Sequence, residues 1–235
     1  SMSLALGEAI LANGGSVMPL ACAEAFDAWM RRKPVDIGNT VRRNLLTFRQ
    51  TGVSVAPSSD HDAGNGAAMR VLPVALATLG QSAAAVSAAV QAQAHVTHNN
   101  AVSDAVCQFL TLAVQDLVRG CSLAETLSHH LGSLLAGHPE LSFRDRPRRE
   151  NPSGWVVETL QAGLQGLDDG DDFEDCLVDV VNRGGDADTT GAIAGMLAGA
   201  LYGPQGIPKR WLNALDPGVA SRCRAQARSL LPVTA

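Results

Sequence analysis

Glycine recurs at every fourth position of one apolar segment, and this spacing constrains the fold more than any other feature of the sequence. Gly191, Gly195, Gly199 and Gly203 fall in the apolar run 191–203. In an α-helix these positions form one ridge without side chains, so a second helix can approach closely. The pattern predicts a buried central helix. The run is well short of the roughly 20 apolar residues that cross a bilayer, so we expect no membrane span.

Most of the chain repeats apolar residues at helical spacing, and runs of alternating β-branched residues are absent. This predicts an all-α fold. The 235 residues, 46% of them hydrophobic, are enough for a single compact multi-helix domain over residues 1–235. The expected helices cover residues 3–12, 20–32, 40–50, 67–79, 83–96, 103–118, 122–135, 155–166, 173–182, 190–202 and 217–230.

The net charge and the cysteine content bear on the binding partners and the cellular location. The formal net charge of −5 argues against nucleic acid as a partner, and the local basic run RDRPRRE at 144–150 is interpreted as a solvated loop. The five cysteines are an odd number and no two have CxxC spacing. We therefore expect reduced thiols and a cytoplasmic location.

The segment GGDADTT at 184–190 places oxygen-bearing side chains at the mouth of the glycine-spaced helix. Asp186, Asp188 and Thr189 offer only oxygen donors, which suits Mg²⁺ or Mn²⁺ better than Zn²⁺. Gly184-Gly185 lets the backbone turn, and Thr189 or Asp188 is expected to cap a helix that begins near residue 190. The alternative is that the two aspartates only cap the helix and interact with its dipole.

A second motif, HDAGNGAAMR at 61–70, lies in one of two long stretches without helical periodicity, 52–66 and 137–154. Asp62 precedes a Gly-Asn-Gly turn that leads into a helix, so the backbone N–H groups of residues 64–67 are placed to face an anion such as a phosphate. An ordinary tight turn explains the same residues equally well.

Two further motifs are ambiguous by themselves. His98 and Asp104 in THNNAVSDA at 97–105 are both compatible with structural roles at a helix junction. The acidic run DDGDDFED at 168–175 lacks the ligand order of an EF-hand, and we interpret it as a solvated turn and helix start.

Taken together, the motifs HDAGNGAAMR at 61–70, VTHNNAVSDA at 96–105 and GGDADTTGAIAGMLAGALYG at 184–203 resemble the ADP-ribosylglycohydrolase family. The chain is most similar to its dinitrogenase reductase-activating members, since RRKPVDIGNTVRR at 31–43, VLPVALATLG at 71–80 and IPKRWLNAL at 207–215 also fit. The resemblance implies an all-α fold, two Mg²⁺ or Mn²⁺ ions, and hydrolysis of the N-glycosidic bond between ADP-ribose and a protein arginine. The partner would be an ADP-ribosylated protein, with the iron protein of nitrogen fixation as the natural candidate.

The resemblance also implies roles for individual residues. Asp186, Asp188 and Thr189 match metal ligands, and Asp62 matches an acidic residue beside the ribose that acts in proton transfer or sugar opening. The substrate-binding positions are Gly64, Asn65 and Gly66 in the turn, the pocket residue His98, and Trp155, which stands where relatives tend to have a tyrosine. Tryptophan keeps the stacking surface and loses the hydroxyl.

The family also uses a Thr-Asp-Asp-Thr element that would lie immediately before Met2, so we expect an N-terminally truncated domain. Three ligands on one side leave much of a six-coordinate shell to water, which predicts one weakly held ion or none and low activity. The alternative function is that of a catalytically inactive ADP-ribose-binding or scaffold protein.

Overall fold

A computed structural model describes residues 1–231 of the chain. Helices account for the regular secondary structure of these residues, and the nearest approach to a sheet is an isolated bridge between Gly64 and Trp155. This confirms the predicted all-α class. The elements in chain order are α1 Met2–Ala12, α2 Pro19–Arg31, α3 Asn39–Thr51, the 3₁₀ turn η1 Ala68–Arg70, α4 Leu72–Ala77, α5 Ala83–Ala94, α6 Ala101–Val118, α7 Leu123–Gly137, the 3₁₀ turn η2 Pro139–Leu141, α8 Val156–Asp169, α9 Phe173–Asn182, α10 Ala187–Gly206, α11 Lys209–Ala214 and α12 Pro217–Leu230.

Three details differ from the predicted helices. The expected helix at 67–79 is divided into η1 and α4, with Pro73 in the first turn of α4, where its missing N–H costs little. Past the predicted end at residue 202, α10 continues to Gly206 across a kink at Gly203, whose φ is 68°, just before Pro204. The short helix α11 was not predicted at all, because six residues are too few to show a helical period.

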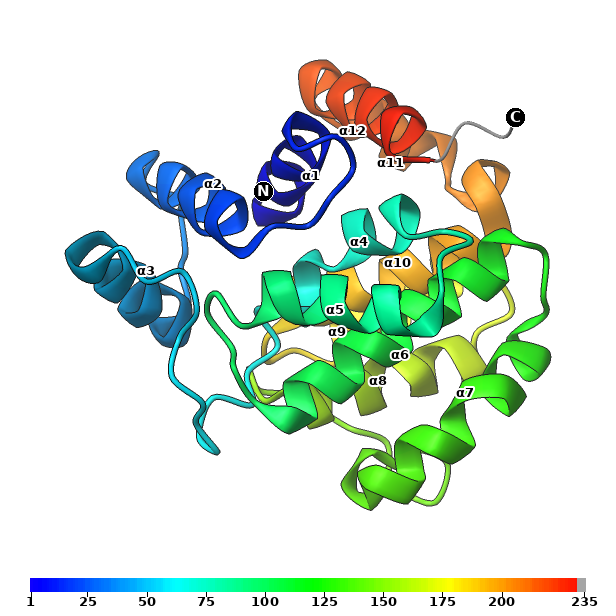
Figure 1. The fold of residues 1–235 in the computed structure, drawn as a ribbon. Helices are drawn as coiled ribbons and strands as arrows, with labels where there is room; N and C mark the ends of the chain where they lie inside the picture. The colour runs from blue at the N-terminus through cyan, green and yellow to red at the C-terminus, as the bar shows by residue number, and fades with distance from the viewer. Residues whose placement is uncertain (232–235) are drawn as a thin grey trace.

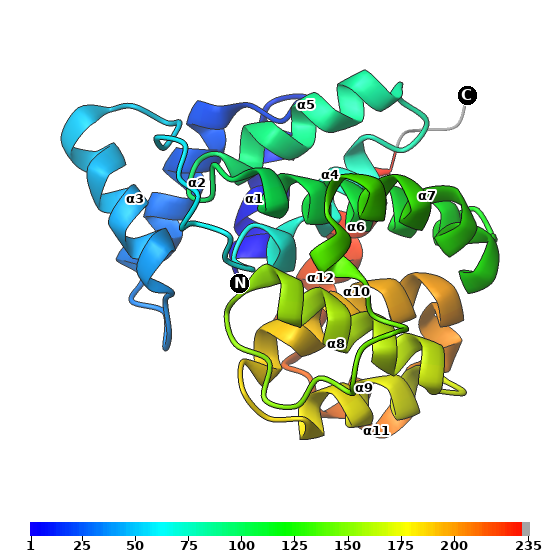
Figure 2. The same ribbon diagram turned by 90° about the horizontal axis from the view of Figure 1, so that it is seen from below.

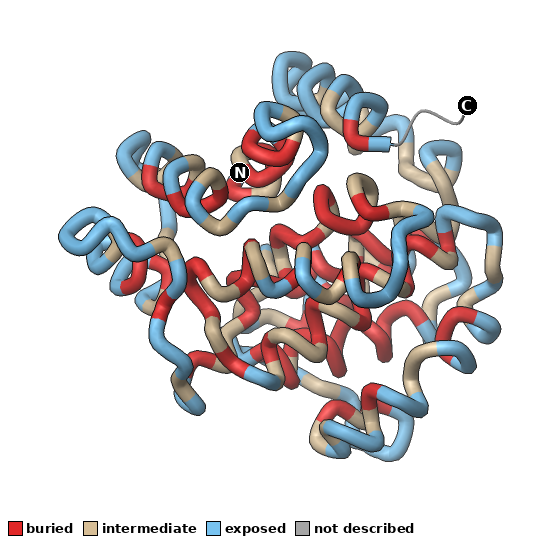
Figure 3. The backbone as a smooth tube through the Cα atoms, viewed as in Figure 1, coloured by how far each residue is buried: buried red, intermediate tan, exposed pale blue. Residues whose placement is uncertain are grey.

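The centre of the molecule is α6, which contacts α4, α5, α7, α8 and α10. Buried residues are concentrated in this central group and also line α1 and the inner face of α2, whereas the outer faces of α2, α3 and α12 are exposed (Figure 3). By length and composition α6 could cross a membrane, and it is the one such helix in residues 1–231. More than half of it is buried among its five neighbours, as in the core helix of a folded domain.

The glycine ridge of α10 packs where the sequence predicted a close neighbour. A Cβ atom on Gly191 would lie 3.1 Å from a Val181 methyl group, and one on Gly195 would lie 3.6 Å from Leu177. Both contacts are with α9, so the i, i+4 ridges of the two helices face each other. Gly203 is not part of this contact, since it forms the kink.

The two ends of the described chain lie side by side, since α1 packs against α12 (Figure 1). Gln226 donates a hydrogen bond to the Leu4 carbonyl at 2.9 Å and covers Gly7. Viewed from below, α2 and α3 lie at one side of the molecule, and α8, α9 and α10 form a separate group (Figure 2). The beginning of α10 faces the loop before α8, and the candidate site lies there.

Candidate active site

The loop 151–156 joins two segments that are far apart in sequence. On one side, Asn151 N–H donates to the Arg183 carbonyl at 2.8 Å and Asp186 N–H donates to the Pro152 carbonyl at 2.7 Å. On the other side, Asn65 N–H donates to the Gly154 carbonyl at 2.9 Å. The backbone of one loop therefore fixes the Gly-Asn-Gly turn relative to the start of α10.

Gly184 and Gly185 make this docking possible. Both have positive φ, 77° and 63°, which side-chain-bearing residues rarely adopt. A Cβ on Gly185 would lie 2.2 Å from the Pro152 carbonyl oxygen, and one on Gly184 would lie 2.7 Å from the Asn151 side chain. The glycine pair is required both by its turn and by the close approach of the neighbouring loop.

Asp186 stands at the N-cap position of α10, but its side chain caps nothing. Its Oδ2 instead accepts a hydrogen bond from Asn65 Nδ2 at 2.7 Å, and the same amide donates to Thr159 Oγ1 at 3.0 Å. The expectation that Thr189 or Asp188 caps a helix beginning near residue 190 is wrong, because the docked glycine turn lets the helix begin three residues earlier, at Ala187.

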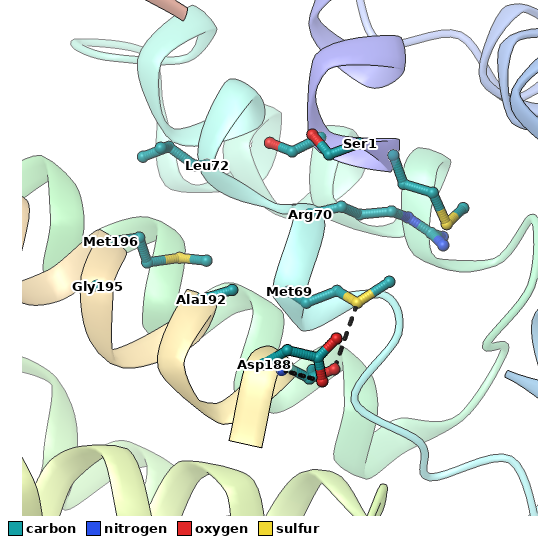
Figure 4. Close-up of a pocket in the computed structure, with 11 residues that line it drawn as sticks. Ser1, Met69, Arg70, Leu72, Asp188, Ala192, Gly195 and Met196 are labelled. Carbon is teal, nitrogen blue, oxygen red and sulfur yellow. Dashed lines mark hydrogen bonds between the residues drawn. The ribbon is translucent and has the colours of Figure 1, made fainter. Parts of the chain in front are cut away.

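Asp188 and Thr189 lie in the first turn of α10. The Thr189 N–H donates to Asp188 Oδ1 at 3.0 Å, and the Thr189 hydroxyl lies 3.9 Å from the Met69 sulfur. Figure 4 shows Asp188 at the start of the helix, with Ala192 and Met196 farther along it beside a cavity of about 410 Å³. Neither Asp186 nor Asp188 forms an ion pair with a described residue.

His98 is almost fully buried beneath the Gly-Asn-Gly turn. A Cβ on Gly64 would lie 2.9 Å from His98 Nε2, and one on Gly66 would lie 2.8 Å from Cε1. The two glycines therefore leave room for the ring. Burial, together with the positive charges of Arg70 and Arg43, lowers the pKa of His98 to about 3, so the ring is neutral at neutral pH.

The hydrogen bonds around His98 also assign its tautomer. Thr97 Oγ1 accepts from Arg70 Nη2 at 2.9 Å and lies 2.8 Å from His98 Nδ1. The hydroxyl proton is thus free to donate to Nδ1, which places the ring proton on Nε2. Nε2 is the nitrogen beside Gly64, and no hydrogen bond among residues 1–231 engages it.

A second cavity, of about 420 Å³, brings most of the predicted site residues together. Aspartates 36, 186 and 188 line it, whereas no lysine or arginine of the described chain does. Such a lining attracts a cation. The predicted residues in the wall are Gly64, Asn65, Gly66, His98, Asp186, Asp188 and Thr189.

Asp62 and Trp155 are the two predicted site residues outside this wall. The carboxylate of Asp62 is buried and accepts from Arg43 Nη2 at 2.5 and 2.6 Å. Trp155 contributes its backbone to the bridge with Gly64, and its side chain is 44% exposed. The N–H groups expected to face an anion are not all available, since that of Asn65 donates to Gly154.

None of the site residues predicted from the sequence lies on one whole side of this cavity, although RRKPVDIGNTVRR at 31–43 carries part of the family resemblance. This side is formed by the end of α2, the loop before α3 and the first turn of α3, and its residues are Trp29, Asp36, Ile37, Gly38, Asn39, Thr40 and Val41. Within this region Asp36 and Gly38, in the segment VDIGNT, were the detectable signals. Ser1, Met2, Met69 and Gly154 complete the wall.

The comparisons with known proteins agree with this geometry. The model of the family described as ADP-ribosylglycohydrolase matches residues 1–234. The chain is 44% identical to the ADP-ribosyl-[dinitrogen reductase] glycohydrolase of Rhodospirillum rubrum, over 98% of this chain and 76% of that protein. It is 33% identical to the ADP-ribosylarginine hydrolase Tri1 of Serratia proteamaculans (strain 568), over 92% of this chain and 62% of that one.

Solved structures show the same relationship. The fold matches a chain of an ADP-ribosylglycohydrolase-related protein complex with a TM-score of 0.85 and 32% identity, covering 98% of this chain and 78% of the other. The match to the family model extends over nearly the whole sequence. The chain belongs to the ADP-ribosylglycohydrolase family of hydrolases, which act on glycosidic bonds.

Proposed function

We propose that this chain hydrolyses the N-glycosidic bond between ADP-ribose and a protein arginine, with Mg²⁺ or Mn²⁺ bound in the cavity at the start of α10. One observation carries the proposal: Asp186 and Asp188 line the same cavity as His98, and neither carboxylate has a basic partner among residues 1–231. The names of the R. rubrum and S. proteamaculans relatives support the reaction class and the arginine linkage.

The donor set fits a hard divalent cation. Asp186, Asp188 and Thr189 supply oxygen atoms, and Asp36 adds negative charge to the wall. When bound, such an ion would orient ribose hydroxyl groups and lower the pKa of a water molecule. Asp186 and Asp188 are the residues that would hold it, with the Thr189 hydroxyl as a further ligand.

The surrounding residues set the orientation of these donors. The amide of Asn65 holds Oδ2 of Asp186, which leaves Oδ1 for the cavity. The neutral His98 ring presents its Nε2 proton beside Gly64, where it can donate to a ligand oxygen. Gly64 and Gly66 keep the turn close enough for this contact. The substrate-binding roles proposed for Gly64, Asn65, Gly66 and His98 rest on these positions.

Asp62 and Trp155 are proposed to act at the edge of the site. Asp62 would transfer a proton or stabilise the positive charge that develops at the anomeric carbon, which requires its carboxylate to leave Arg43. Trp155 would stack on the ligand through its half-exposed indole. We propose a cytoplasmic location, and we infer from the relative's name that dinitrogen reductase is the first target to test.

The test is release of ADP-ribose from an ADP-ribosylated arginine protein by the 235-residue chain, with and without Mn²⁺. We expect weak, metal-dependent release, because three ligands on one side hold the ion loosely, and loss of this release in Asp186→Asn. Asp168→Asn is the matched control, because this acid is paired with Arg144 away from the cavity. Calorimetric binding of ADP-ribose without any release would reject hydrolysis by this chain and favour an inactive binding protein. Absence of both would reject the ligand-binding alternative too.

A further inference from the structure

A second group of metal-compatible side chains lies on α6 and α7, outside the cavity at the start of α10. Asp116 is near the end of α6, and His129 and His130 are adjacent residues of α7. In residues 1–231 this is the one set of three His, Cys, Asp or Glu donor atoms that all lie within 4.8 Å of one another. The expected ligands Asp186 and Asp188 are not part of it.

The two histidines converge on one oxygen atom. His129 Nδ1 lies 2.8 Å and His130 Nε2 lies 2.9 Å from Asp116 Oδ2. Adjacent helical side chains diverge by about 100° around the axis, and the two rings reach this oxygen with different nitrogens. The rings meet edge to face, with centroids 5.8 Å apart. Two imidazole nitrogens and one carboxylate oxygen therefore lie within 4.8 Å of one another.

This donor set differs in chemistry from the one in the cavity. Imidazole nitrogens favour Zn²⁺ and related transition-metal ions, whereas Mg²⁺ prefers oxygen. Tetrahedral zinc with ligand distances of about 2.0–2.2 Å places its ligand atoms roughly 3.4 Å apart. The present separations of 2.8 and 2.9 Å need to widen by only about half an ångström, and the His129 side chain is 54% exposed.

Space is available for a fourth ligand. A cavity of about 360 Å³ is lined by both histidines, together with Phe109, Leu112 and His138. The side-chain oxygen of Gln108 in the same wall is buried and has no hydrogen-bond partner among the described residues. A water molecule on a bound ion would face this cavity or the solvent.

We propose that Asp116 Oδ2, His129 Nδ1 and His130 Nε2 bind one Zn²⁺-class ion between α6 and α7, separate from the Mg²⁺ or Mn²⁺ site proposed at α10. The metal binds the unprotonated ring nitrogen that faces Asp116. A neutral imidazole therefore carries its single proton on the other nitrogen when the ion is bound, and an imidazolium releases one proton to solvent. The bound ion ties the end of α6 to the middle of α7.

Calorimetric titration with Zn²⁺ tests this site. We expect one ion per chain in the Asp186→Asn variant, where the cavity is impaired, and at least a tenfold lower affinity when His129→Ala is added. His129 is well exposed, so its removal spares the fold, which a melting curve without metal verifies. His95→Ala is the matched control, since His95 pairs with Asp104 alone and its loss should leave Zn²⁺ affinity unchanged.

Nitrogen-15 NMR chemical shifts of the histidine rings provide a second measurement. These shifts would not change on Zn²⁺ addition if the histidines only stabilised the fold. Zn²⁺ should change the chemical shifts of Nδ1 of His129 and Nε2 of His130. The chemical shifts of both His95 nitrogens should stay the same. Unchanged Zn²⁺ affinity in the His129→Ala variant would overturn the proposal. So would an equal loss in the His95→Ala variant, or ring shifts at the opposite nitrogens.

Discussion

The two candidate metal sites of this chain are built in different ways. At the start of α10 the donors are oxygen atoms, and backbone hydrogen bonds from the loop 151–156 fix their position. Between α6 and α7 the donors are two imidazoles and one carboxylate, and two regular helices carry them without any special backbone. The first site therefore depends on how the chain turns, and the second on which side chains two helices present.

This contrast has consequences for stability as well as for metal choice. The α10 site includes buried groups and positive-φ glycines, so substitutions there cost folding free energy. The α6–α7 cluster has a largely exposed histidine, so side-chain removal there mainly changes ligand binding.

Gly185→Ala should produce the largest loss, about 4 kcal/mol, because it combines a positive φ with a clash against Pro152. Gly80→Ala is the matched control: its φ is 85° but open space surrounds it, so about 1–2 kcal/mol of strain is expected alone. Urea unfolding measures both. Equal losses in the two variants would show that the loop 151–156 does not hold the turn tightly.

His98 should make folding pH-dependent. Its pKa is about 3 when folded and near 6.5 when unfolded, so the unfolded chain binds the extra proton. Stability is therefore fully present above pH 6.5 and falls as the pH drops toward 3, by about 2–3 kcal/mol between pH 7 and pH 4. In His98→Gln the unfolding free energy should not show this contribution to the pH dependence. Identical slopes in the two proteins would contradict a buried neutral ring.

Local patterns in the sequence were enough to predict most of the helices, and the ligand role of GGDADTT stays a prediction. The i, i+4 glycines predicted the α9–α10 contact because such spacing acts within one helix. The start of α10 was misplaced because the docking of Gly185 on Pro152 is a contact between distant segments. Sequence patterns do not report such contacts.

The same limit explains the missed parts of the site. Asn65 meets Asp186 across 121 residues of sequence, and Asp36 joins the wall only through the packing of α2 and α3. Asp116 and the histidine pair are 13 and 14 residues apart on two helices, so no short motif marks them. By contrast, the reading of 168–175 as a turn and helix start is confirmed, since Asp172 caps α9.

Asn65→Ala should affect the α10 metal site and not the α6–α7 site, because its side-chain amide contacts Asp186. It removes hydrogen bonds to Asp186 and Thr159, one of them to a carboxylate, and should cost about 2 kcal/mol. Asn99→Ala removes one bond to a backbone carbonyl and should cost about 1 kcal/mol. Mn²⁺ titration should show weaker binding in Asn65→Ala alone, with Zn²⁺ binding at the α6–α7 cluster intact. A matching loss of Mn²⁺ affinity in both variants would argue against a specific role for this amide.

Asp188→Asn should have the smallest effect on stability and a clear effect on metal choice. Asp188 is exposed and forms no ion pair in the described chain, and an asparagine oxygen can still accept the Thr189 N–H, so the substitution should change the unfolding free energy by less than about 0.5 kcal/mol. Mn²⁺ affinity should nevertheless fall at least about tenfold, equivalent to 1.4 kcal/mol, because a charged oxygen ligand is lost. Zn²⁺ affinity should stay the same, and Asp116→Asn should give the reverse pattern. If either variant weakened both metals equally, the two sites would not be chemically independent, and donor type would not explain which ion each one holds.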